Sequence, residues 1–210
     1  MKSVLGTILA GGIAAALLAQ DPPAPAMKFA LYDPTDPALS EMAKSGERLI
    51  DRVGGSLMVE VERMLGTVGL EASVQELHLK NLHPPRPVEG KPRVTEIKRT
   101  SFRVRNPRNT PDAADLAVLE AIRADLNSGT APPKLLLQKV EREGLPVEWR
   151  VYRPISVGPN CLLCHGPVES LQPPIRNALE RYYPEDKATE YAAYDWRGVI
   201  RVSYERPDGR

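Results

Sequence analysis

Cysteine and histidine are scarce in this chain of 210 residues, which has two cysteines and three histidines. A structural zinc site needs four ligands, so a site built on both cysteines would also require His78 and His83. The βαβ pattern that surrounds a thioredoxin-like redox dithiol is not found around the cysteines. The composition therefore argues against a dithiol oxidoreductase, and it leaves a zinc site and a simple disulfide open as minor alternatives.

An excess of charge of one sign is also lacking, because 28 basic and 27 acidic residues leave a net charge of +1. Bulk charge therefore predicts no partner. A local basic run extends from Arg86 to Arg108, where the sequence has eight Lys and Arg residues and only two acidic residues, Glu89 and Glu96. We expect no nucleic-acid binding, because this run lacks interleaved aromatic residues beyond Phe102. A solvated face is its simplest explanation.

No hydrophobic run is long enough for a comfortable membrane span, since the N-terminal one covers only Val4–Leu18. Lys2 precedes this uncharged run and a polar, proline-rich stretch follows it, which is the layout of a secretory signal peptide. We predict a signal peptide at residues 1–20, a Pro-rich linker at residues 21–37 and one domain at residues 38–210. The protein is then periplasmic or secreted, and it meets the membrane only if the signal segment stays uncleaved.

The expected elements place helices before an antiparallel sheet. Apolar residues recur every three or four positions from Leu39 to Leu65, which predicts a long amphipathic helix that ends at Gly66 and Gly69. The other expected elements are helices at residues 71–82, 111–126 (N-capped by Thr110) and 175–183, and strands at residues 97–105, 135–140, 147–155 and 198–204. The third helix is expected to bury Leu116, Leu119, Ile122 and Leu126. This order, without internal repeats, predicts an α+β fold.

Both cysteines and one histidine fall in a single stretch, Cys161-Leu162-Leu163-Cys164-His165. Two thiols three residues apart with a histidine directly behind them have the spacing of a c-type haem attachment site. Each thiol can add to one vinyl group, and the imidazole is then held beneath the iron as an axial ligand. We therefore predict one covalent haem c, anchored by Cys161 and Cys164, with His165 as the proximal iron ligand.

Three blocks of sequence carry a resemblance to a known family. The first block is RTSFRVRNPRN at residues 99–109. The second runs from YRPI at residues 152–155 to CLLCHG, and the third joins YPEDKA at residues 183–188 to RGVI at residues 197–200. These blocks resemble the PAS-like haem c domains of unknown function, a family of lone secreted proteins and of extracytoplasmic input domains of bacterial sensor kinases. The resemblance spans most of residues 39–204. It implies a PAS-like antiparallel sheet with flanking helices and one covalent haem.

The chain departs from this family at one position, because it has no third cysteine. Family members often carry a cysteine in the second helix that resembles a distal iron ligand. His78 lies at or next to that position, on the same expected helix face as Val74, and it is our first choice for the distal ligand. The alternatives that stay open are His83, one of Met58 and Met64, or an iron with an open or water-bound sixth position.

These residues predict a single-haem electron-transfer or redox-responsive protein rather than an enzyme, because a six-coordinate iron has no vacant position for chemistry. The alternative is a haem-based gas or redox sensor, in which NO or CO displaces a weak distal ligand and a partner carries the output. A peroxidase-type enzyme would need an open distal side, with His78 as its acid/base residue. We expect a redox protein or a small gas as the partner. Arginines between Arg86 and Arg108 could pair with haem propionates or with an acidic redox partner.

Overall fold

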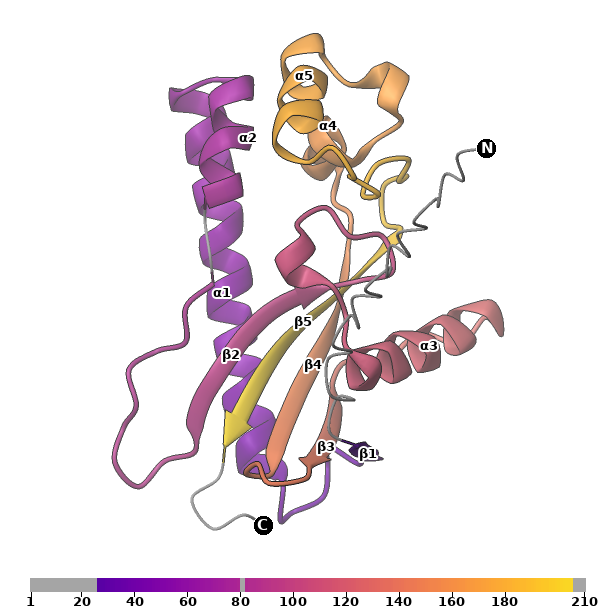
Figure 1. Cartoon of the computed structure of the whole chain (residues 1–210). Coiled ribbons are helices and arrows are strands. Elements are labelled where there is room, and N and C mark those ends of the chain that lie inside the picture. The colour runs from indigo at the N-terminus through magenta and orange to yellow at the C-terminus, as the bar shows by residue number, and fades with distance from the viewer. Residues whose placement is uncertain (1–25, 80–81, 206–210) are drawn as a thin grey trace, which may run out of the picture.

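The computed structural model describes residues 26–79 and 82–205, and its centre is one antiparallel β-sheet (Figure 1). The strands lie in the order β1-β3-β4-β5-β2, with every neighbouring pair antiparallel. Their bounds are β1 Met27–Tyr32, β2 Arg93–Thr100, β3 Leu136–Arg142, β4 Glu148–Ser156 and β5 Trp196–Glu205. The α-helices are α1 Ser40–Thr67, α2 Leu70–Leu79, α3 Ala113–Asn127, α4 Leu162–His165 and α5 Pro173–Tyr182. The predicted α+β class, with flanking helices and a long N-terminal helix, is confirmed.

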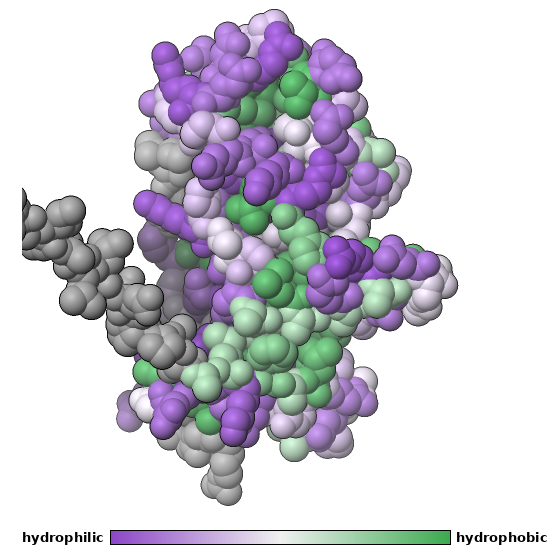
Figure 2. Space-filling view, turned by 45° about the vertical axis from the view of Figure 1, so that its right-hand side comes forward, coloured by the Kyte–Doolittle hydropathy of each residue, from purple (hydrophilic) through white to green (hydrophobic). Residues whose placement is uncertain are grey.

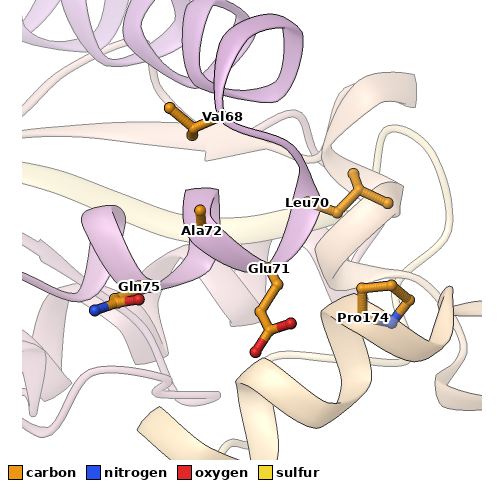
Figure 3. A pocket seen from close by; sticks show the side chains of 6 residues that line it. All are labelled: Val68, Leu70, Glu71, Ala72, Gln75 and Pro174. Atoms are coloured by element: carbon orange, nitrogen blue, oxygen red, sulfur yellow. The ribbon is translucent and has the colours of Figure 1, made fainter.

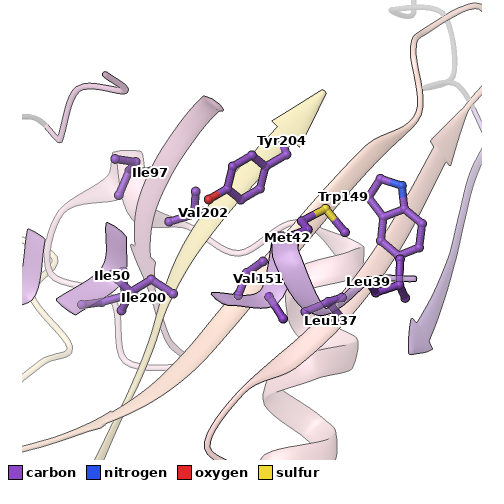
Figure 4. Packing of buried hydrophobic residues seen from close by; sticks show 11 residues of the cluster. Leu39, Met42, Ile50, Ile97, Leu137, Trp149, Val151, Ile200, Val202 and Tyr204 are labelled. Carbon is purple, nitrogen blue, oxygen red and sulfur yellow. The ribbon is translucent and has the colours of Figure 1, made fainter. Parts of the chain in front are cut away.

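Helix α1 packs its apolar stripe along one face of the sheet (Figure 4). The shared core is built by buried residues of α1, the residue before it and four strands: Leu39, Met42, Ala43, Ile50, Ile97, Leu137, Trp149, Val151, Ile200, Val202 and Tyr204. Removing this apolar area from water stabilises the fold by roughly 25 cal/mol per Å². The closest approach is at Gly46, where an added Cβ would lie 2.6 Å from the side chain of Val151. The absence of a side chain at Gly46 therefore sets the distance between α1 and β4.

Helix α3 covers the opposite face of the sheet, because Tyr152 points away from the face to which its neighbour Val151 belongs. Asp115 of α3 is fully buried there. It accepts hydrogen bonds from Arg201 at 2.8 and 2.9 Å, from Tyr152 at 3.0 Å and from Arg150 at 3.2 Å. Burial raises the pKa of Asp115, and the two guanidinium groups supply the opposing charge. A buried network of this kind fixes the position of α3 more than it adds net stability.

Two local predictions around α3 and β2 are wrong. The strand expected at residues 97–105 begins earlier and ends earlier, as β2, Arg93–Thr100. It ends there because the chain turns at Ser101, whose hydroxyl forms hydrogen bonds with the backbone of Arg103. The N-cap of α3 is Asp112 and not Thr110, since Asp112 and Asp115 form a reciprocal capping box.

The apolar face expected for α3 is also partly wrong. Leu119 and Ile122 are buried as predicted, whereas Leu116 and Leu126 are exposed. The helix buries Ala114 and Val118 in their place. Figure 2 shows that hydrophobic surface gathers over the lower half of one face of the molecule, below a mostly hydrophilic upper end. None of the described helices has the length and apolarity that a membrane crossing requires.

Strand β1 lies within residues 21–37, where a linker and no strand was predicted. It pairs with β3, and Tyr32 packs edge-on against Trp149 with ring centroids 5.0 Å apart. Most of its side chains are exposed, so the sequence lacks the alternation that marks a half-buried strand. Residues 27–32 therefore belong to the sheet rather than to a linker. The predicted signal peptide, residues 1–20, lies outside the described residues.

Replacing Gly46 by alanine should destabilise the protein by about 1–3 kcal/mol, because the added methyl group overpacks the contact with Val151. Urea unfolding followed by circular dichroism measures this loss.

Gly55→Ala is the matched control in the same helix, because no atom lies within 4 Å of a Cβ at that position. It should stabilise the protein by about 0.5–1 kcal/mol through the higher helix propensity of alanine. Equal effects of the two substitutions would contradict the close packing of α1 on β4.

Candidate functional site

The five-residue motif lies at the end of the molecule toward which β4 rises (Figure 1). After β4 the chain turns through a short 3₁₀ segment into α4. Two hydrogen bonds fix this entry, from the amide of Val157 to the carbonyl of Asp195 (2.9 Å) and from the amide of Tyr194 to the carbonyl of Val157 (2.7 Å). Helix α4 ends where the amide of Gly166 donates to the carbonyl of Leu162 at 2.9 Å. The motif is therefore tied to the segment that leads into β5.

The two cysteines are free thiols that face two different apolar clusters. Cys164 packs against the cluster shared by α2 and α5, which consists of Val74, Leu171, Ile175, Ala178, Leu179 and Tyr183. Cys161 and Leu162 pack against Val157, Ala188 and Tyr191. Burial raises the pKa of Cys164, whereas thiols used for redox exchange have a lowered pKa. The surroundings therefore do not favour a dithiol redox centre.

His165 is held as a neutral imidazole in one orientation. Its Nδ1 lies 2.6 Å from the carbonyl oxygen of Ala188, which can only accept a hydrogen bond, so Nδ1 carries the proton. Burial lowers the pKa of His165 well below its usual value, and the positive charges of Arg105 and Arg197 lower it further. The remaining nitrogen, Nε2, therefore keeps a free lone pair, which is the state that ligates a metal.

The Ala188 carbonyl is itself fixed by a partly buried ion pair. Arg105 Nε donates to Asp186 Oδ2 at 2.9 Å, and Arg105 Nη2 donates to the carbonyls of Cys164 at 2.5 Å and Ala188 at 3.3 Å. Asp186 Oδ1 accepts from the amide of Ala188 at 2.8 Å. Arg105 and Asp186 therefore join the motif to the segment that orients His165.

Backbone bonds and an aromatic ring complete this frame. The amides of Glu190 and Tyr191 donate to the carbonyls of Gly166 and His165, each at 3.0 Å. The ring of Tyr191 meets the ring of His165 edge-on, with centroids 6.3 Å apart. The guanidinium carbon of Arg103 lies 4.1 Å from the centroid of the Tyr191 ring. The histidine is thus held through its ring, its backbone and its neighbours.

The residues considered for the sixth iron ligand lie in different surroundings. His78 belongs to α2, one turn beyond Val74, which is buried in the cluster that Cys164 contacts; the side chain of His78 lies outside the described residues. His83 is exposed, and so is Met58, whereas Met64 is 1% exposed. The structure thus brings α2 to Cys164, and the choice of His78 stays a prediction.

A cavity of about 480 Å³ lies beside the turn between α1 and α2 (Figure 3). Its walls are formed by Val68, Leu70, Glu71, Ala72, Gln75 and Pro174. None of these residues belongs to the motif. Within the described part of the chain, no group of three or more His, Cys, Asp or Glu side chains could hold a metal ion.

A comparison with protein families matches residues 80–204 to the model described as Tll0287-like. The chain belongs to this family. All three blocks that carried the resemblance lie inside the matched range, whereas α1 and α2, with His78, precede it. Among solved structures, the chain is similar to the crystal structure of the cyanobacterial heme-protein Tll0287, at 15% identity and a TM-score of 0.41. That alignment covers 74% of this chain and 96% of the other, and no curated protein matches.

The sequence alone did not identify the residues that orient His165 in this Tll0287-like protein. Arg105 and Asp186 fall in the first and third resemblance blocks, which is the one signal that could have selected them. Ala188 acts through its backbone, so its side-chain type carries no information about the role. The arginines of the basic run are not simply a solvated face, because Arg105 and Arg103 are partly buried around the motif.

Replacing Arg105 by methionine should destabilise the protein by about 2–4 kcal/mol. The largely buried carboxylate of Asp186 would then lack the cation that neutralises its charge. Chemical unfolding measures the loss.

The double variant Arg105→Met/Asp186→Asn separates the ion pair from general packing. It should lose less than the sum of the two single variants, because the uncompensated charge is gone. Additive losses would show that the two side chains act independently.

Proposed function

We propose that this protein carries one haem c, attached through Cys161 and Cys164, with His165 as the proximal iron ligand. The observation that carries the proposal is the 2.6 Å contact between His165 Nδ1 and the carbonyl oxygen of Ala188. A metal-ligating histidine almost always donates its other ring N–H to such an acceptor, which fixes the tautomer and raises the basicity of the ligating nitrogen. Membership of the Tll0287-like family agrees with this proposal.

The surroundings of the two thiols fit the same proposal. Both sulfur atoms border apolar clusters, and both side chains keep partial exposure, so a large apolar ring system could reach them. The arginines around His165 also leave an excess of positive charge, which suits the two propionate groups of a haem. When bound, the haem supplies a one-electron couple.

We infer electron transfer or a redox response outside the cytoplasm as the role, and no enzymatic activity. His78 is our proposed distal ligand, because the helix that carries it packs through Val74 on the cluster that includes Cys164. Two imidazole ligands would give a lower reduction potential than a histidine and a methionine. A redox protein is the expected partner. The sequence of residues 1–20 supports export, and the proposed covalent haem attachment would agree with it, because such attachment is normally completed outside the cytoplasm.

A second candidate is a haem-based gas or redox sensor. It is favoured by the direct hydrogen-bonded connection from His165 and Gly166 to the segment that enters β5, a central strand of the sheet. A change at the proximal ligand would be passed to the sheet along this connection, and a partner would carry the output.

Co-expression with a cytochrome c maturation system tests the attachment. The wild type should keep its haem on a denaturing gel, and the variant Cys161→Ser/Cys164→Ser should lose it. Each single variant should shift the pyridine haemochrome band to longer wavelength, because one vinyl group stays conjugated.

Leu163→Ser is the matched control for the attachment test, since Leu163 is exposed and lies between the two cysteines. It should keep the haem. A colourless wild type, or a haem that stays bound to the double cysteine variant on the gel, would overturn the proposed attachment.

The sixth ligand is tested by the visible spectrum of His78→Ala, oxidised and reduced, with and without CO. Loss of a strong-field ligand should turn a low-spin, CO-indifferent spectrum into a high-spin, CO-binding one. His83→Ala, which changes an exposed histidine, should leave the spectrum as it was. A wild type that binds CO readily would favour the sensor, and an unchanged His78→Ala spectrum would remove His78 as ligand.

A further inference from the structure

A second cavity, of about 220 Å³, lies where the residues after β2 meet the start of β5. Three of its walls are aromatic: Phe102, Tyr191 and Trp196. Two guanidinium groups, those of Arg103 and Arg197, also line it. The volume corresponds to about seven water molecules, so the cavity suits a small planar group rather than a drug-sized ligand.

The two arginines differ in how fully they are used. Arg103 donates from each of its three nitrogens to backbone carbonyls of residues 187–190, so its role is to hold that segment. Arg197 donates through Nη1 alone, to Ser101 Oγ at 2.7 Å and to the carbonyl of Arg103 at 3.0 Å. Within the described residues, Nε and Nη2 of Arg197 have no acceptor. Arg197 therefore presents unused donors.

The positive charge of these arginines is only partly offset, although the carboxylate of Asp186 acts on Arg197. Neither Arg103 nor Arg197 forms an ion pair with any carboxylate among the described residues, although Asp195 lines the same cavity. Their guanidinium carbons lie 4.1 and 5.3 Å from the centroid of one ring, that of Tyr191. Burial lowers the pKa of Arg197, and the positive charges of nearby arginines lower it further. An anion in the cavity would relieve this repulsion.

We propose that the cavity between Arg197 and the aromatic side chains of Phe102, Tyr191 and Trp196 is a carboxylate-binding site beside the proximal histidine. The planar guanidinium matches a carboxylate in shape and charge, and the aromatic walls accept the apolar part of the ligand. The ring of Tyr191 contacts both the cavity and His165. An occupied site would therefore place a negative charge one ring away from the imidazole.

The carboxylate can come from two sources, a free small organic acid or a propionate of the attached haem. Only the second source rests on the proposed function, because the first requires no haem. Benzoate serves as the probe for the free ligand, and benzamide is its neutral isostere.

Titration calorimetry on the full-length protein, with haem where it is attached, tests the free ligand. Benzoate should bind with one site per chain, and benzamide at least about tenfold more weakly. Arg197→Gln should weaken benzoate binding about tenfold or more, the scale of a lost charge-assisted contact. Arg52→Gln, an exposed arginine of α1, should leave it unchanged. The comparison of benzoate with benzamide uses the wild type alone, so it holds even if Arg197→Gln does not fold.

The propionate source is read from the reduction potential of the haem-loaded protein as a function of pH. If a propionate fills the cavity, benzoate does not bind, and Arg197→Gln raises the pH at which the potential changes, relative to Arg52→Gln. The proposal is overturned if benzoate binds no better than benzamide and Arg197→Gln leaves the pH profile of the potential unchanged. A protein that carries no haem would contradict the proposed function. Titration of that protein with benzoate would still decide whether the cavity binds a carboxylate.

Discussion

The orientation of one backbone carbonyl, that of Ala188, controls the chemistry at the motif. It accepts from His165 Nδ1 and from Arg105 Nη2, so it sets both the tautomer of the histidine and the place of a nearby cation. Asp186 fixes the backbone of Ala188 as well, because its carboxylate accepts a hydrogen bond from the Ala188 amide. The histidine is therefore oriented by a closed set of directional bonds, which lose energy steeply when their geometry changes.

The two sides of the site come from different parts of the chain. The side that holds His165 is built from α4 and the segment before β5, and directional hydrogen bonds tie it to the sheet. The helix α2, which carries the proposed distal ligand, meets α5 through apolar side chains and one exposed ion pair, Arg181–Glu71, at 3.8 Å. Apolar contact has little directional preference. The structure thus joins a rigid half to a half whose position is set mainly by packing.

The sequence predicted the parts of this arrangement that have a period or a spacing. Helix α1 and the strands β3 to β5 belong to that class. The haem site at Cys161, Cys164 and His165 rests on a spacing as well, and it stays a prediction. Strand β1 was missed because its side chains are mostly exposed, and β2 was displaced because Phe102 and Val104 mimic an alternating strand inside a turn. The acceptor for His165 could not be predicted, because it is a backbone atom brought from 23 residues away by tertiary structure.

Helix α1 is about 42 Å long at 1.5 Å per residue, and it meets the sheet over only its first half. Its packing on the sheet extends to Val53 and to Gly54, where an added Cβ would lie 3.7 Å from Ile200 Cδ1. The part of α1 beyond Gly55 carries α2 past the strands (Figure 1). The contacts that hold α2 in place therefore come chiefly from α5 and from α1, and not from the sheet.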